Sequence, residues 1–174
     1  MTHVAVVGPS GAGKDTLMLA ACAIRPDLRL VRRVITRPSG SGGEDFEGVT
    51  PEAFAQMQAQ GRFLLDWQAH GLRYGLPRDA FLDGPVLVNL SRRALAQAAT
   101  VLPGLHVIHI TARPEVLAKR LSARGREDAG QIAARIARGT GPLPEGLPVT
   151  HIDNSETVET AVRAFLAALD KVNA

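Results

Sequence analysis

The sequence is poor in cysteine, in the large aromatic residues and in lysine. Its 174 residues include one cysteine, one tryptophan and one tyrosine, and only three of its 20 basic residues are lysines. A single cysteine cannot form an internal disulfide, so we predict a reducing, cytoplasmic location and a buried apolar role for Cys22. No apolar run reaches the length of a membrane span, and residues 3–7 are typical of a strand rather than a signal peptide. We therefore expect no membrane partner.

The charge of the chain is only mildly positive, at +3. It has no lysine-rich tail and no aromatic–basic module, so a nucleic-acid partner is not expected. Its arginines gather in two segments, and planar guanidinium groups suit bidentate contacts with small phosphates. We predict small-molecule partners, and the oligomeric state stays open.

A glycine-rich segment, GPSGAGKD at residues 8–15, lies between an apolar strand at 3–7 and a helix that begins near Thr16. Glycines let the backbone turn so that successive N–H groups point inward at the positive end of the helix, where they bind phosphate oxygens. Lys14 would reach the outer phosphates. The alternative is a glycine-rich turn with a solvated lysine. The predicted nucleotide-binding residues are Gly8, Pro9, Ser10, Gly11, Ala12, Gly13, Lys14, Asp15 and Thr16.

Strands and helices alternate along most of the chain, which predicts an α/β protein with a parallel sheet covered on both faces. We expect one domain over 1–174, with a small insertion at about 33–76. Ser91 is expected to cap one helix, and Asn154 or Ser155 another. The predicted strands are 28–35, 62–67, 72–75, 85–90, 105–111 and 149–152, and the predicted helices are 50–60, 92–100, 114–123, 127–138 and a last one after 155.

Two groups of arginines have a functional and a structural interpretation. Arg120 and Arg124 are four residues apart on a helix, with Arg135 further along, in a segment of about 120–140. Like charges at this spacing are mildly destabilising unless an anion lies between them, so they predict either a lid over phosphate or a solvated basic face. Arg32, Arg33 and Arg37 lie where a strand opens into the insertion, which suits an acceptor phosphate. His106 and His109 are expected to be core or edge residues of a strand.

Over nearly its whole length the chain resembles the guanylate-kinase superfamily. The resemblance is carried by GPSGAGK at 8–14, Thr36-Arg37 with a downstream Gly43-Glu44, 63–67, Tyr74-Gly75 and the arginines at 120, 124 and 135. It implies a P-loop kinase three-layer sandwich with a mostly parallel central sheet, an acceptor-binding insertion and an arginine-bearing lid. It also implies ATP and Mg²⁺ as cofactors, catalytic roles for Lys14, Arg120, Arg124 and Arg135, and a place for Asn154 beside the adenine.

Within that superfamily the chain is most similar to the ribose 1,5-bisphosphate phosphokinases. Residues 13–15, 35–38, 42–44, 67–75 and 88–92 carry this closer likeness. It implies ATP-dependent phosphorylation of ribose 1,5-bisphosphate to 5-phosphoribosyl 1-diphosphate, a step of phosphonate breakdown. The acceptor-binding residues that we expect are Arg33, Thr36, Arg37, Glu44, Arg73, Tyr74, Asn89 and Arg92.

The sequence departs from true guanylate kinases in the residues that bind the acceptor. Residues 39–41 read Ser-Gly-Ser where those enzymes have a second arginine, and no tyrosine follows Glu44. The acidic residue that reads guanine falls near Leu65-Asp66, with an alignment uncertain by one residue. A site without these groups should discriminate guanine poorly. The alternatives are a kinase for GMP or another nucleoside monophosphate, and a non-catalytic guanylate-kinase-like binding domain, which the intact phosphate loop disfavours.

The magnesium ligands also depart from the usual P-loop pattern. Asp15 stands where most P-loops have a serine or threonine, and Asn89 stands where guanylate kinases have a strand-end acid. We therefore expect Asp15 to supply the anionic contact to Mg²⁺, directly or through water, with Thr16 as a weaker oxygen nearby. The alternative is that Asp15 is only a favourable acid in the first helical turn.

Overall fold

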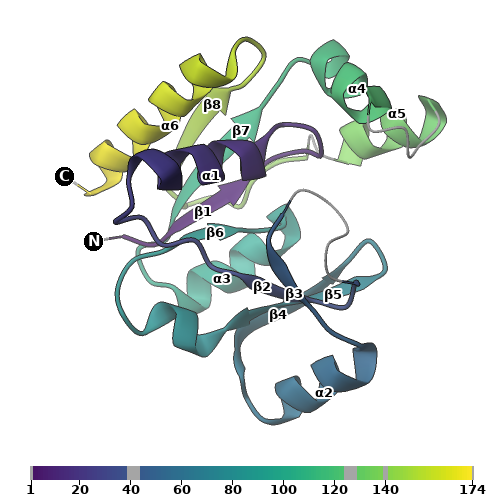
Figure 1. The fold of residues 1–174 in the computed structure, drawn as a ribbon, viewed down its shortest axis with the longest axis vertical. Coiled ribbons are helices and arrows are strands. Elements are labelled where there is room, and N and C mark those ends of the chain that lie inside the picture. The colour runs from purple at the N-terminus through teal and green to yellow at the C-terminus, as the bar shows by residue number, and fades with distance from the viewer. Residues whose placement is uncertain (1, 39–43, 124–128, 139–140, 174) are drawn as a thin grey trace.

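The computed structural model describes residues 2–38, 44–123, 129–138 and 141–173, except for the side chains of Ala129, Arg135, Arg138 and Asn173. The body of the molecule is built on one parallel sheet with the strand order β6-β1-β7-β8 (Figure 1). Its strands are β1 (Val4–Val7), β6 (Leu87–Asn89), β7 (His106–Thr111) and β8 (Val149–Asp153). Because all four strands run the same way, their carboxyl ends meet at one edge, where ligands of α/β proteins bind.

Helices cover both faces of this sheet, as predicted. Alternate residues of β1 face opposite ways, so Val4 and Val6 pack with α1 (Lys14–Ile24) and α6 (Val158–Asn173). Ala5 and Val7 face the side of α3 (Leu95–Val101). Figure 1 shows α1 and α6 together on one face and α3 on the other. The α/β class and the parallel central sheet are therefore confirmed.

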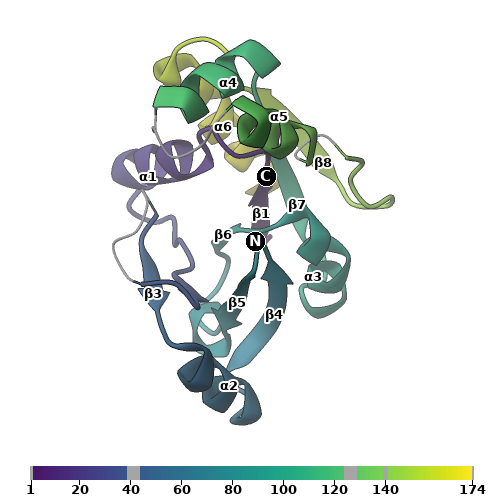
Figure 2. The ribbon, with the colours of Figure 1, turned by 90° about the vertical axis from the view of Figure 1, so that its right-hand side faces the viewer.

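A second sheet extends away from the body with the strand order β3-β2-β5-β4. It contains β2 (Arg33–Ile35), β3 (Phe46–Gly48), β4 (Phe63–Ala69) and β5 (Leu72–Pro77). Its outer face is covered by α2 (Pro51–Ala59), with Phe54 packed on Val34 and Phe63 (Figure 2). Its inner face shares one apolar cluster with the body and α3. We call the segment 33–77 the insertion.

Two helices, α4 (Pro114–Ala123) and α5 (Ala129–Arg138), stand together beside the glycine-rich end of β1 (Figure 1). Short 3₁₀ turns occupy η1 (Arg78–Phe81) and η2 (Arg92–Ala94). Within the described ranges, no helix is long and apolar enough to cross a membrane.

Three local predictions were wrong for tertiary reasons. The strand predicted at 28–35 is only Arg33–Ile35, because residues 29–31 first run along β6 and then cross from the body to the insertion. Ser91 does not cap its helix, because its hydroxyl accepts a hydrogen bond from Trp67 Nε1 at 2.9 Å. The last helix is capped by Thr157, whose Oγ1 accepts from the N–H of Thr160 at 3.2 Å, and not by Asn154 or Ser155.

Candidate active site

The phosphate loop turns tightly at the end of β1 and leads into α1. A Cβ atom on Gly8 would lie 2.1 Å from the carbonyl oxygen of Ile110 in the neighbouring strand, so no larger residue fits there. Gly11 and Gly13 have φ values of 85° and 90°, in the left-handed region that glycine adopts without strain. This geometry leaves the backbone N–H groups at the N-terminus of α1 in position to bind an anion.

Lys14 is the first residue of α1, and its side chain folds back over the loop. Its Nζ donates to the carbonyl oxygens of Gly8 at 2.9 Å and Pro9 at 3.2 Å. The ammonium is thereby held over the loop, where phosphate oxygens would replace carbonyl oxygens as its partners.

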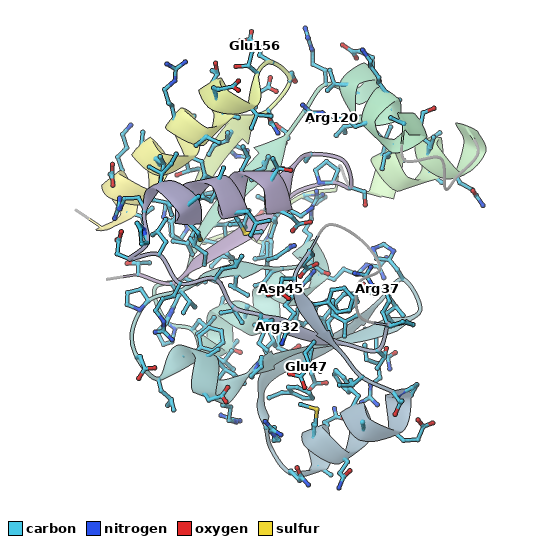
Figure 3. The ribbon with its side chains drawn as sticks, viewed as in Figure 1. Arg32, Arg37, Asp45, Glu47, Arg120 and Glu156 are labelled. Carbon is cyan, nitrogen blue, oxygen red and sulfur yellow. The ribbon has the colours of Figure 1, made fainter. Side chains whose placement is uncertain are left out.

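Asn154 and Arg120 support the loop from the body side. Asn154 is 2% exposed, and its Nδ2 donates to the carbonyl oxygen of Ala12 at 2.8 Å. Arg120 Nη2 donates to the carbonyl oxygen of Asn154 at 2.9 Å, and its Nη1 to that of Gly11 at 3.3 Å (Arg120 is labelled in Figure 3). The amide of Asn154 is buried against the loop and positions it, and the expected contact of Asn154 with adenine stays a prediction.

Asp15 and Asn89 meet between α1 and β6. Asn89 Nδ2 donates to Asp15 Oδ1 at 2.8 Å, and Asn89 is 6% exposed. The pKa of Asp15 is raised, first by burial and then by the charge of Glu44, while Lys14, Arg33 and the Asn89 hydrogen bond act in the opposite direction. A nearby cation would stabilise the ionised form of this carboxylate.

Arg33 and Glu44 form a buried ion pair on the inner face of the insertion. Arg33 Nε lies 2.6 Å from Glu44 Oε1, and Nη2 lies 2.5 Å from Oε2, a bidentate arrangement. The Arg33 Cζ atom is 5.2 Å from the centre of the Tyr74 ring. Tyr74 in turn stacks on Trp67, with ring centres 5.3 Å apart and planes at 8°. Burial raises the pKa of the Tyr74 hydroxyl, so it stays protonated and able to donate.

Arg37 and Thr36 follow at the end of β2. The Arg37 Cζ atom lies 4.3 Å from the centre of the Phe46 ring, a cation–π contact. Arg37 Nε is buried, and within the described part of the chain it has no hydrogen-bond partner. Thr36 Oγ1 accepts from the N–H of Arg73 at 2.9 Å, which ties β2 to β5. Arg37 thus holds a donor that an acceptor phosphate would satisfy.

The structure separates Arg73 from this group, and its expected contact with the acceptor stays a prediction. Neighbouring residues of a strand face opposite ways, so Arg73 lies on the outer face while Tyr74 lies on the inner one. Its Cζ is 4.6 Å from the Phe54 ring, and its Nη2 donates to Gln58 Oε1. Asp66 also faces this side, accepting from Gln58 Nε2 at 2.9 Å. The inner-face positions near the expected guanine reader are Leu65 and Leu76, both apolar and buried.

The described part of the structure does not place the remaining expected residues in this group. Arg92 Nη1 donates to the carbonyl oxygen of Gly141, and burial lowers the pKa of the Arg92 guanidinium. Arg124 and Gly43 lie outside the described residues. Arg135 belongs to α5, and its side chain lies outside the described part. The roles of these residues stay predictions.

His109 is a neighbour of the site that was expected only to be a core or edge residue. It pairs in register with Val7, the last residue before the loop, and its Nδ1 lies 3.3 Å from Nδ1 of His151. Burial, followed by the charges of Arg92, His151 and Lys14, lowers the pKa of His109 to about 4. The ring is therefore neutral at physiological pH. Only the register of β7 against β1 brings it there, and no motif signals it.

The parallel sheet, the phosphate loop and the insertion give this chain a P-loop fold of the guanylate-kinase type. No family model matches the chain. Among solved structures, the guanylate kinase from Anaplasma phagocytophilum superposes with a TM-score of 0.69 at 18% identity, over 98% of this chain and 85% of that one. At this identity the likeness shows the fold alone.

Curated relatives show the family. The ribose 1,5-bisphosphate phosphokinase PhnN of Ruegeria sp. (strain TM1040) is 51% identical over 164 residues, covering 91% of this chain and 86% of the relative. The protein of the same name from Rhizobium etli (strain CIAT 652) is 48% identical over 174 residues, covering 96% of this chain and 88% of the relative. The chain belongs to the ribose 1,5-bisphosphate phosphokinase family.

Proposed function

We propose that the chain transfers the γ-phosphoryl group of ATP to the 1-phosphate of ribose 1,5-bisphosphate, giving 5-phosphoribosyl 1-diphosphate and ADP. The observation that carries this assignment within the fold is the inner face of the insertion. Arg33 lies beside Tyr74 and Arg37 beside Phe46 on this face, and Leu65 and Leu76, near the expected guanine reader, are apolar and buried. Such a surface suits an acceptor that has phosphates and no base.

The reaction is an in-line displacement in which the acceptor is already ionised. An oxygen of the 1-phosphate forms a bond to the γ-phosphorus, while the bond from that phosphorus to the β–γ bridging oxygen breaks and its electron pair leaves with ADP. No general base is needed, because no proton has to be removed from the nucleophile. Catalysis is therefore positioning and charge stabilisation, by the loop N–H groups and Lys14 on one side and by acceptor-side arginines on the other.

Arg33 and Arg37 have different parts in acceptor binding. Arg37 Nε is buried without a hydrogen-bond partner in the described residues, so a phosphate oxygen would satisfy it directly. Arg33 is already paired with Glu44, which fixes the plane of its guanidinium beside Tyr74. We infer that Arg37 contacts the acceptor phosphate and that Glu44 holds Arg33 in place for a second contact.

Mg²⁺ fits the residues between the loop and the acceptor face. Asp15 and Asn89 offer oxygens at adjacent positions, and the raised pKa of Asp15 reflects a buried carboxylate close to Glu44. Magnesium takes one or two carboxylates together with substrate phosphates and waters. When bound, the ion would neutralise charge on the β- and γ-phosphates. Asp15 would hold it, with Asn89 keeping the carboxylate oriented.

We also propose a cytoplasmic location and a role in phosphonate breakdown.

The decisive experiment offers the chain ATP–Mg²⁺ with ribose 1,5-bisphosphate, GMP and AMP in parallel, and identifies the products by mass and phosphorus NMR. Ribose 1,5-bisphosphate should be converted far faster than either nucleotide, and Lys14→Ala should abolish the difference by abolishing turnover. Equal or faster turnover of GMP would overturn the assignment in favour of a nucleoside monophosphate kinase. ATP binding with no turnover of any acceptor would support a non-catalytic domain.

A further inference from the structure

A cavity of about 320 Å³ lies where the insertion joins the body, apart from the phosphate loop. The body contributes residues 29–32 to its wall, and the insertion contributes Glu47, Met57 and Arg62, with Asp79 from the turn that follows β5. Glu47 lies on the opposite side of β3 from Phe46, which faces the acceptor side. Figure 3 shows Arg32 and Glu47 near each other above α2. The cavity is thus distinct from the candidate active site.

The cavity has the size and the mixed lining of a small-molecule site. Ligand pockets are mostly in the range of about 300–1,000 Å³, with an apolar lining and a few convergent polar groups. Here Leu30, Val31 and Met57 supply apolar surface. The polar groups are three arginines and two carboxylates, which come from separate segments of the chain.

The charged groups of the lining are three arginines and two carboxylates, and two of the arginines also have ion-pair partners outside the lining. Arg29, Arg32 and Arg62 line it against Glu47 and Asp79. Arg29 Nη2 donates to the carbonyl oxygen of Ala80 at 3.1 Å and lies 3.7 Å from Asp83 Oδ2, while its Nη1 is buried and has no hydrogen-bond partner among the described residues. Arg32 Nε donates to Asp45 Oδ1 at 3.0 Å, so the charge of Arg32 is already compensated. Arg62 has no ion pair within the described residues, and it is the cation that an anionic ligand would meet.

We propose that this cavity is a second ligand site, which binds a phosphate monoester with a sugar-sized body. Guanidinium groups suit the phosphate, in particular that of Arg62 and the Nη1 group of Arg29. Glu47 and Asp79 accept from hydroxyl groups, and Leu30 with Met57 packs against the carbon skeleton. The site does not depend on which acceptor the active site phosphorylates.

The position of the cavity couples it to the active site. Its walls belong to both the body and the insertion, so its shape changes whenever the insertion moves relative to the phosphate loop. A ligand that prefers one arrangement shifts the affinity for the acceptor, and the acceptor shifts the affinity for that ligand by the same factor. The expected effect is on the KM for the acceptor.

Calorimetric titration tests the site in protein saturated with a non-hydrolysable ATP analogue and Mg²⁺. Ribose 5-phosphate, AMP and inorganic phosphate are the probes, and they separate a sugar phosphate, a nucleotide and a bare anion. At least one of the two esters should bind at a site that survives Arg37→Ala. Arg62→Ala should weaken that site about ten- to hundredfold, because charged hydrogen bonds contribute strongly to binding. Arg163→Ala, which removes one exposed charge on α6, is the matched control and should leave it unchanged.

Arg29→Gln is the second variant, and thermal melting checks that each protein is folded. The proposal is overturned if neither ester binds beyond the site removed by Arg37→Ala, or if both Arg62→Ala and Arg29→Gln bind the esters as the wild type does. Binding of inorganic phosphate alone would equally overturn it, since the apolar and acidic parts of the lining would then have no function.

Discussion

Replacing Glu44 by glutamine should destabilise the protein strongly and should make its stability depend on the acceptor. The pair is well buried, with side-chain exposures of 8% for Arg33 and 17% for Glu44. Removing one partner of a buried ion pair leaves an uncompensated charge, at a cost of about 3–5 kcal/mol. For a domain of this size each kcal/mol lowers the melting temperature by about 2–4 °C, so the expected fall is about 6–20 °C.

Addition of the acceptor should recover part of this loss. In the variant Arg33 has no carboxylate partner, and a phosphate of ribose 1,5-bisphosphate can take that place. The acceptor should therefore raise the melting temperature of Glu44→Gln by more than it raises that of the wild type. Differential scanning fluorimetry with and without the acceptor measures both quantities.

Two controls separate the effect of an unpaired buried charge from general damage to the segment around Glu44. Asp45→Asn removes the adjacent carboxylate, whose pair with Arg32 is exposed, and such pairs contribute at most about 1 kcal/mol. The double variant Arg33→Met/Glu44→Leu removes both charges, so it should regain most of the stability and still lose affinity for the acceptor. Two results would contradict this prediction. One is that Glu44→Gln has the same melting temperature as Asp45→Asn, and the other is that the double variant keeps the wild-type KM for the acceptor.

Three further outcomes are expected. Asp15→Asn should raise the Mg²⁺ concentration needed for half-maximal rate at saturating ATP, and an unchanged requirement would discard the magnesium assignment. Arg120→Ala should lower kcat by more than it weakens ATP binding, because an arginine at the transferring phosphate contributes mainly in the transition state. If the variant instead has normal turnover and a lower melting temperature, the role of Arg120 is only to support the phosphate loop. The pKa of His109 is about 4 in the folded protein against an ordinary value of 6.5. Between these pH values the unfolded chain binds a proton at this residue and the folded chain does not. Stability should therefore fall as pH drops from about 6.5 to 4, by about 1–2 kcal/mol after allowance for partial exposure, and His109→Asn should flatten that part of a urea-denaturation series.

The sequence was sufficient for the features that depend on local chemistry. The glycines and Lys14 of the phosphate loop, between an apolar strand and a helix, predicted the local fold because few backbones can accommodate that pattern. The alternation of apolar strands with helices likewise predicted the parallel sheet, since both faces of such strands must be buried. The turn at Gly61, which ends α2, follows from the same local rules.

The tertiary structure decided which side chains meet. Arg73 and Tyr74 are adjacent in the sequence, yet the pairing of β5 sends one to α2 and the other to Arg33. His109 reaches the phosphate loop only through its register with Val7, and Asn154 reaches Ala12 from 142 positions away. A strand has a side-chain period of two, so a shift of one residue reverses every face, and sequence pattern alone does not specify that register. The loop could thus be read from the residues themselves, whereas the acceptor face exists only once β2, β4 and β5 have paired.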